Sequence, residues 1–148
     1  MIPFLVLIAS TLILRALGLA GVSVLQSWAI CLRGGLAAML LLTASAHWGK
    51  RRPDLIRMVP ASFPRPDLII TVTGLLEIAG AIGLLLPSTA PAAAVCLALL
   101  LIAMFPANVR AARHNLPIAG TTATPLPLRT LMQVVFIAAL CIAGFASC

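Results

Sequence analysis

The chain is organised as long apolar runs separated by short polar connections. Each run is close to the roughly 20 residues that an α-helix needs to cross a bilayer. Nearly every position within a run is apolar, so the helical period is weak, as is typical of lipid-embedded helices. The pattern predicts an all-α transmembrane helix bundle that forms a single membrane domain over residues 1–148. The predicted helices are 2–25, 29–48, 68–86, 92–109 and 129–147.

Composition supports an integral membrane protein. Hydrophobic residues make up 62% of the chain and charged residues only 9%, with a mean hydropathy of +1.16. A soluble domain has about a quarter of its residues charged. The net charge of +7 suits loops that meet anionic lipid. Because the chain has no Tyr and does not interleave aromatic and basic residues, we expect the lipid bilayer, and no nucleic acid, as a partner.

Basic residues alternate between the connections. The connections at 49–67 and 110–129 are rich in Lys and Arg, whereas 22–32 and 87–92 carry no charge. Cytoplasmic loops carry the excess of basic residues, so both basic connections are predicted to be cytoplasmic. The N-terminus is then cytoplasmic and the C-terminus outside, in what we expect to be a bacterial inner membrane. Within the first basic connection, 55–63 is predicted to form a short interfacial piece or turn of helix.

The first apolar run resembles a signal peptide only in part. It has no basic segment before the apolar stretch, and Arg15 interrupts that stretch. Small residues at Gly18 and Ala20 would suit a cleavage site. On balance the run is predicted to remain as an uncleaved first span.

Three charges fall inside predicted spans: Arg15, Arg33 and Glu77. A carboxylate at the centre of a span costs roughly 2.5–3.5 kcal/mol on insertion scales, so it needs a partner. At about 1.5 Å per residue, Glu77 and Arg33 lie roughly 13 and 21 Å from the cytoplasmic side. We expect a buried Glu77–Arg33 ion pair, with Arg15 as second partner or reaching outward. The alternative is a pair that only fixes helix register.

The four cysteines are Cys31, Cys96, Cys141 and Cys148, and no C-x-x-C motif occurs. The predicted topology places all four in the outer half of the membrane or beyond it, where disulfides are permitted. Cys141 and Cys148 are about 10 Å apart along a helix, too far for a bond. A redox role for these thiols, with a disulfide from Cys31 to Cys148 or Cys96, is one possible interpretation. Four small buried hydrophobic side chains are the favoured interpretation.

The pattern of histidine and amide residues favours a small-molecule pocket over a metal site. His47 and His114 both lie near the cytoplasmic side, but haem ligation is disfavoured because both look interfacial. No Cys/His cluster indicates zinc or an iron–sulfur centre. His47, Asn108 and Gln133 are expected at similar depth and could line one small cytoplasmic-side pocket. A quinone headgroup or another small amphipath would suit it, although no residue selects one and the cofactor is left unknown.

Four stretches in order resemble the DoxX-like membrane proteins: "CLRGGLAAMLLLTASAHW", "MVPASFPRP", "TGLLEIAGAIGLLLP" and "LLIAMFPANV". The resemblance runs from about Arg33 to the C-terminus and implies a four-helix core, with the first helix as an addition. Trp48 departs from the expected Phe but keeps an interfacial aromatic. The positions that match are Arg33, His47, Pro60, Pro64, Pro66, Gly74, Glu77, Gly80, Pro106 and Asn108.

The resemblance implies the fold more firmly than it implies a function, which would be a redox role. Relatives of this type include a subunit linked to thiosulfate–quinone electron transfer, proteins associated with redox enzymes, and receptor-assembly chaperones. We expect a small subunit or accessory of a membrane redox system, at most part of an oxidoreductase, with a membrane or redox protein as partner and quinone as a candidate ligand. A non-enzymatic assembly or scaffold protein is the alternative, and a small transporter or proton path through Glu77 is the third. A homo-oligomer is left open.

Overall fold

The computed structural model describes residues 2–117, 120 and 124–146, and this part of the chain is entirely helical. A short helix α3 (Arg52–Met58) and a 3₁₀ turn η1 (Ser23–Gln26) join the longer elements. The five long helices are α1 (Ile2–Leu19), α2 (Trp28–Ser45), α4 (Pro66–Leu85), α5 (Ala90–Arg113) and α6 (Leu126–Phe145). All five are long and apolar enough to cross a membrane. The predicted all-α bundle with five spans is therefore confirmed, and the chain is an integral membrane protein.

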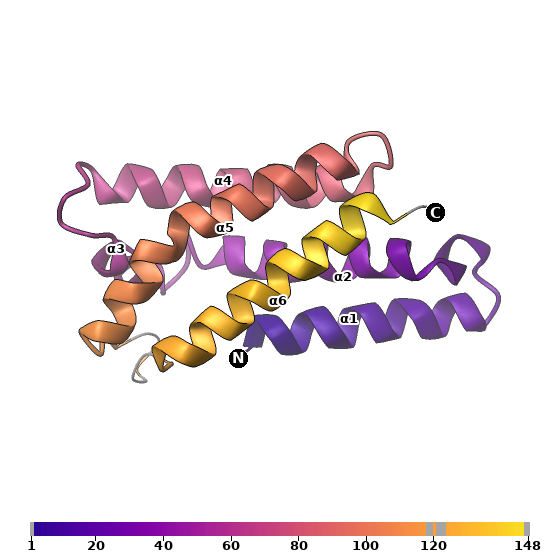
Figure 1. Cartoon of the computed structure of the whole chain (residues 1–148), viewed down its shortest axis with the longest axis horizontal. Coiled ribbons are helices and arrows are strands. Elements are labelled where there is room, and N and C mark those ends of the chain that lie inside the picture. Colours follow the sequence, from indigo (N-terminus) through magenta and orange to yellow (C-terminus); the bar gives the residue numbers. More distant parts are fainter. Residues whose placement is uncertain (1, 118–119, 121–123, 147–148) are drawn as a thin grey trace.

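The helices form two layers that cross obliquely (Figure 1). In one layer α1, α2 and α4 lie side by side, with α2 in the middle. In the other, α5 and α6 run next to one another across the first layer. Helix α5 packs on α4, and α6 packs on α2. The four helices α2, α4, α5 and α6 thus make a core, and α1 is added at the edge of one layer, as the sequence predicts.

Helix boundaries differ from the predicted ones where glycine or proline decides them. Helix α1 ends at Leu19 rather than near residue 25, because Gly21 adopts φ = +114° and turns the chain into η1. Helix α5 continues through Pro106 to Arg113, beyond the predicted end at 109. Every α-helix except α2 carries proline at its first or second position, where its missing N–H is no loss. These prolines are Pro3, Pro53, Pro66, Pro91 and Pro127.

The core follows from the central place of α2. Leucines from four helices are completely buried around it, and small residues let the helices approach. A Cβ added at Gly80 would lie 2.4 Å from the Leu97 side chain, and one added at Gly144 would lie 2.5 Å from Ala94. The fully buried leucines are Leu36, Leu40, Leu84, Leu97 and Leu140.

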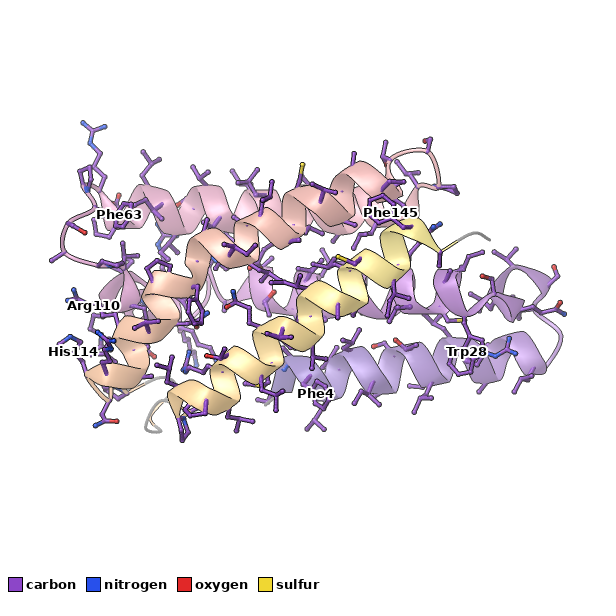
Figure 2. All side chains as sticks on the ribbon, viewed as in Figure 1. Phe4, Trp28, Phe63, Arg110, His114 and Phe145 are labelled. Carbon is purple, nitrogen blue, oxygen red and sulfur yellow. The ribbon has the colours of Figure 1, made fainter. Side chains whose placement is uncertain are left out.

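The outer surface of the bundle is apolar along its length, with charge gathered at one end. Figure 2 shows side chains projecting from every helix; Arg110 and His114 lie at one end, and Trp28 lies at the other. The connection 46–65, the end of α5 and the start of α6 lie at the first of these ends, called here the basic end. Exposed apolar side chains such as Leu5, Leu99 and Leu131 cover the sides, as expected of a surface in contact with lipid.

Helices α1 and α2 approach closely at Gly35, and a substitution there tests how these two helices pack. A Cβ added at Gly35 would lie 2.0 Å from the Thr11 hydroxyl and 3.0 Å from the Leu7 carbonyl oxygen, so Gly35→Ala must push α1 away. At Gly34 the nearest atom within 4 Å is the flexible tip of Leu14. We expect Gly35→Ala to destabilise the protein by about 1–3 kcal/mol, with Gly34→Ala as the milder control. Thermal unfolding in detergent measures both, and equal effects would contradict this packing.

Candidate functional site

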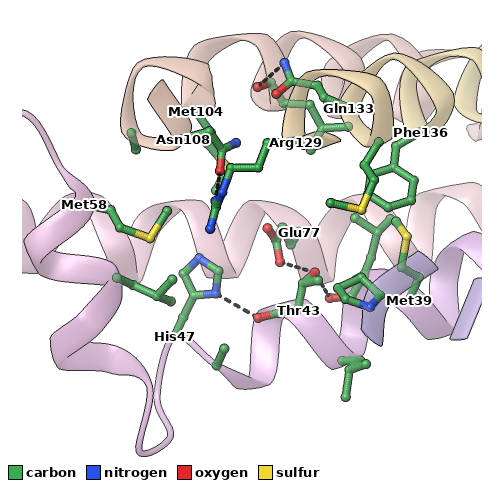
Figure 3. Close-up of a pocket in the computed structure, with 18 of the residues that line it drawn as sticks. Met39, Thr43, His47, Met58, Glu77, Met104, Asn108, Arg129, Gln133 and Phe136 are labelled. Carbon is green, nitrogen blue, oxygen red and sulfur yellow. Dashed lines mark hydrogen bonds between the residues drawn. The ribbon is translucent and has the colours of Figure 1, made fainter. Parts of the chain in front are cut away.

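A cavity of about 430 Å³ lies between the two helix layers at the basic end of the bundle (Figure 3). Helices α2 and α4 form one wall, and α5 and α6 form the other. Leu55 and Met58 of α3 and Ile2 and Pro3 of α1 close its sides. Most of the lining is apolar, and a few polar side chains converge on it. The polar side chains central to the site are Thr43, His47, Glu77, Asn108, Arg129 and Gln133.

The three residues expected to share a pocket all line this cavity. His47 follows the end of α2, Asn108 lies on α5, and Gln133 lies on α6. They reach the cavity from opposite layers, so the site depends on how α2 meets the α5–α6 pair. Glu77, which was expected in an ion pair and was not placed in this pocket, lies on the same wall as His47.

Glu77 is buried within the bundle and bonded to a hydroxyl group. Its side chain is 4% exposed, and the Thr43 hydroxyl donates to Oε2 at 2.8 Å. The same hydroxyl lies 2.9 Å from the Leu40 carbonyl oxygen one turn earlier on α2. Glu77 therefore links α4 to α2 and presents its carboxyl group to the cavity, as Figure 3 shows.

The predicted Glu77–Arg33 ion pair is wrong, because Arg33 finds its partners elsewhere. Arg33 is 6% exposed and its Nε donates to the Ala143 carbonyl oxygen at 2.7 Å. The carbonyl groups and dipole of the last turn of α6 attract a cation, so Arg33 acts as a C-terminal cap on that helix. In the described part of the chain no salt bridge joins Glu77 to a cation.

Arg15 is not a second partner for Glu77 either. Its guanidinium donates to the Gln26 carbonyl oxygen in η1 and lies 5.1 Å from the centre of the Trp28 ring. Both contacts lie at the end of the bundle opposite the basic end. Arg15 therefore joins the end of α1 to the start of α2 through a hydrogen bond and a cation–π contact.

His47 is held in one orientation with one ring nitrogen unpaired. The residue is 3% exposed, and Nδ1 lies 3.1 Å from the Thr43 carbonyl oxygen. A carbonyl oxygen only accepts, so Nδ1 carries the hydrogen, and Nε2 of the neutral ring is an acceptor. Nε2 is buried and has no hydrogen-bond partner among the described residues. Gly74 of α4 lies directly behind the ring, since a Cβ there would come within 2.8 Å of the His47 Cβ and Cγ.

Arg52 of α3 fixes the backbone that carries His47. One of its terminal nitrogens, Nη1, donates to the His47 carbonyl oxygen at 2.7 Å. The other, Nη2, donates to the Asp67 carbonyl oxygen at 3.0 Å and to the Thr71 hydroxyl at 2.9 Å. One guanidinium thus ties the end of α2 to the first turn of α4, and it places His47 and Glu77 on a common wall.

The opposite wall presents hydrogen-bond donors. Nη1 of Arg129 donates to Asn108 Oδ1 at 2.9 Å, which joins α6 to α5, and its Nε donates to the Thr124 carbonyl oxygen at 3.0 Å. Gln133 Nε2 donates to the Leu101 carbonyl oxygen at 3.1 Å. With its Oδ1 accepting from Arg129, Asn108 keeps its amide N–H groups as donors. Figure 3 shows the Arg129 guanidinium and the His47 ring pointing toward one another across the cavity.

The apolar part of the lining is rich in methionine. Four of the five methionines of the chain contribute to it, together with Phe136. Methionine is unbranched and flexible, so a methionine-lined cavity adapts its shape to an apolar body. The methionines are Met39, Met58, Met104 and Met132.

The remaining candidate residues lie apart from the cavity. Cys31 is buried and bonds to the Leu25 carbonyl oxygen, while Cys96 and Cys141 are exposed. All three are free thiols, so Cys31 does not form a disulfide with Cys96, and Cys148 lies outside the described residues. His114 caps the end of α5 and does not line the cavity. Among the residues described, no three His, Cys, Asp or Glu side chains cluster as metal ligands.

Sequence reasoning missed Thr43, Arg129 and the methionines. Thr43 lies four residues before His47, which places both on one face of the predicted helix 29–48, and this spacing was a usable signal. Arg129 was counted only as a basic loop residue, although it opens the first turn of α6 and faces the cavity. The methionines carry no sequence pattern that separates a cavity lining from an ordinary core.

The revised partner of Glu77 predicts which pairs of mutations couple. We expect Thr43→Val and Glu77→Gln to show an interaction free energy of about 0.5–3 kcal/mol, because the two side chains share a hydrogen bond. Glu77→Gln and Arg33→Gln should be additive within about 0.5 kcal/mol. Unfolding free energies of the single and double variants in detergent give both values. A larger interaction free energy between Glu77 and Arg33 than between Glu77 and Thr43 would show that Glu77 and Arg33 form an ion pair after all.

His47, which follows the last residue of α2, predicts a pH dependence of stability. Burial lowers its pKa below the ordinary 6.5, hydrogen bonds with the Thr43 and Ala44 backbone oppose this, and the charge of Arg52 adds to it. The unfolded chain then binds the proton more readily. His47 therefore contributes stability that is fully present above pH 6.5 and is lost as the pH falls through the folded-state pKa. The melting temperature should fall from pH 8 to pH 5, and less so in His47→Asn; an identical fall in both proteins would exclude His47 as the cause.

Comparison with known families gives a match to a family of unknown function. A family model described as a domain of unknown function (DUF8561) matches residues 36–143, well over half of the 148-residue chain. The match begins within α2 and includes the six polar residues of the cavity, while α1 lies outside it. No curated protein and no solved structure matches the chain. On the extent of the family match, the chain belongs to the DUF8561 family.

Proposed function

We propose that this membrane protein binds a quinone-type amphipath in the cavity and acts as a small subunit or accessory of a membrane redox system. The observation that carries the proposal is the cavity itself, where polar groups from both layers converge on an apolar, methionine-rich space. Its volume of about 430 Å³ falls in the range of small-molecule sites. Such a lining suits a small polar head on an apolar tail.

The position of the cavity suits a ligand that enters from the membrane. Its mouth lies at the basic end, and we place that end on the cytoplasmic side by the excess of Lys and Arg in the connections there. The N-terminus is then inside and the C-terminus outside, in the inner membrane of a bacterium. A membrane-soluble carrier could reach the site between the helix layers without leaving the bilayer.

The resemblance to DoxX-like proteins supports the redox part of the proposal. Arg33, His47, Glu77 and Asn108 all match that pattern, and the last three line the cavity. In this role the chain supplies a quinone site, and a partner protein supplies the electron-transfer chemistry. The rival role as an assembly or scaffold protein draws on a different fact: Glu77 and Arg33 both have hydrogen-bond partners within the chain. A scaffold needs no ligand in the cavity.

Filling the cavity separates the two roles. Ala107 of α5 lines the cavity, whereas Ala92 on the same helix is exposed on the outer surface. We expect Ala107→Phe to weaken quinone binding by roughly tenfold or more, since a large ring takes up part of the space. Ala92→Phe is the matched control and should bind normally. Titration of a short-tailed quinone into the purified protein in nanodiscs measures both.

A scaffold would behave differently in the same experiment. It would show no quinone binding in the wild type, and both variants would keep their partner proteins on affinity purification from native membranes. Under the proposed function, the purified complex contains both a redox protein and extractable quinone, and Ala107→Phe loses the quinone while it keeps the protein partner. Retention of both by Ala107→Phe would exclude the cavity as the quinone site.

A further inference from the structure

The polar groups that face one another across the cavity at His47 and Arg129 differ in hydrogen-bonding role. On the wall formed by α2 and α4, His47 Nε2 and the carboxyl group of Glu77 are acceptors. On the wall formed by α5 and α6, the Arg129 guanidinium and the Asn108 amide present donors. A ligand head that lies between His47 and Arg129 satisfies both when it donates to the first and accepts from the second.

From this division we infer that the ligand carries a hydroxyl group on its head, as a phenol or quinol does. The inference rests on the proposed function for the site and adds which chemical form the site prefers. A hydroxyl oxygen donates one hydrogen and accepts through its lone pairs, so a single group serves His47 and Arg129 together. A quinone carbonyl accepts from Arg129 but offers nothing to His47, and an ammonium group only donates.

His47 makes the preference strong because its acceptor is already desolvated. The ring is 3% exposed and Nε2 lacks a partner among the described residues, so the free-energy penalty for removing this atom from water has already been incurred on folding. A ligand that donates a hydrogen bond to Nε2 offsets that penalty, whereas a ligand that cannot donate leaves Nε2 unpaired. The neutral ring cannot offer an N–H instead, because the Thr43 carbonyl oxygen holds the hydrogen on Nδ1 and Gly74 packs behind the ring.

Access to Nε2 requires a small local movement. The atom is covered by its neighbours, so a hydroxyl group reaches it once a flexible side chain changes rotamer. Met58 and Arg129 border the ring in Figure 3 and both line the cavity. Methionine changes rotamer at little energetic cost, and Met58 lies on the short helix α3 at the side of the cavity.

Two matched pairs of ligands test the inference on the full-length protein in nanodiscs. The first pair is para-nonylphenol and its methyl ether, which differ in the hydroxyl hydrogen and have no role as electron carriers. The second pair is decyl-hydroquinone and decyl-benzoquinone under anaerobic conditions. We expect the hydroxyl member of each pair to bind roughly tenfold or more tightly, as measured by titration calorimetry or by displacement of one probe by the other.

Two variants of His47 test whether this residue causes the preference for the hydroxyl-bearing ligand. In His47→Asn the amide nitrogen takes the place of Nδ1 and can still donate to the Thr43 carbonyl oxygen, but no atom takes the place of Nε2. In His47→Gln an amide oxygen can take the place of Nε2. The preference should fall to within about threefold in His47→Asn and should be partly restored in His47→Gln.

The outcomes distinguish the two proposals. Equal binding of both members of each pair, or an unchanged preference in His47→Asn, overturns the inference and leaves quinone binding intact. A preference within the phenol pair, without binding of either quinone form, supports the hydroxyl-bearing ligand and overturns the quinone assignment. Absence of binding by all four probes overturns both.

Discussion

The structure depends on the burial of α2 between its neighbours. Half of its span is buried, a larger share than in any other described span, so the polar groups on its buried face need partners inside the bundle. Arg33, Thr43 and the backbone of the adjoining His47 each reach a different element. Arg33 caps α6, Thr43 bonds to Glu77 of α4, and the His47 backbone is held by Arg52 of α3. Two side chains of α2 and the backbone just after it thus link this helix to three others.

Two charges that look like natural partners are satisfied separately, for a physical reason. The last carbonyl groups of α6 have no intrahelical partners and carry the negative end of the helix dipole. Arg33 lies within reach of them, at the end of the bundle opposite the cavity. Glu77 needs only one hydrogen-bond donor on one oxygen, which Thr43 supplies, and its carboxyl group faces the cavity. Because Arg33 is used elsewhere, Glu77 remains available to a ligand.

The sequence predicts the spans well because hydropathy and length are properties of each segment alone. It also predicts that His47, Asn108 and Gln133 lie at similar depth, since depth follows from position along a helix. It does not predict which way a helix is rotated, because nearly all positions are apolar and the helical period is weak. The partners of Glu77, Arg33 and Arg129 all depend on that rotation. Thr43 was the accessible exception, through its four-residue spacing from His47.

The cavity exists because the two layers close at one end only. Away from the basic end, Gly80, Gly83 and Gly144 let α4, α5 and α6 meet closely against Leu97, Ala93 and Ala94. At the basic end the facing residues are long, and side chains such as Met104, Met132 and Arg129 keep the layers apart. Bonds from Gln133 to the Leu101 carbonyl oxygen and from Arg129 to Asn108 hold α5 and α6 together as one wall. Small residues therefore close the bundle at one end, and long residues keep it open at the other, where the cavity lies.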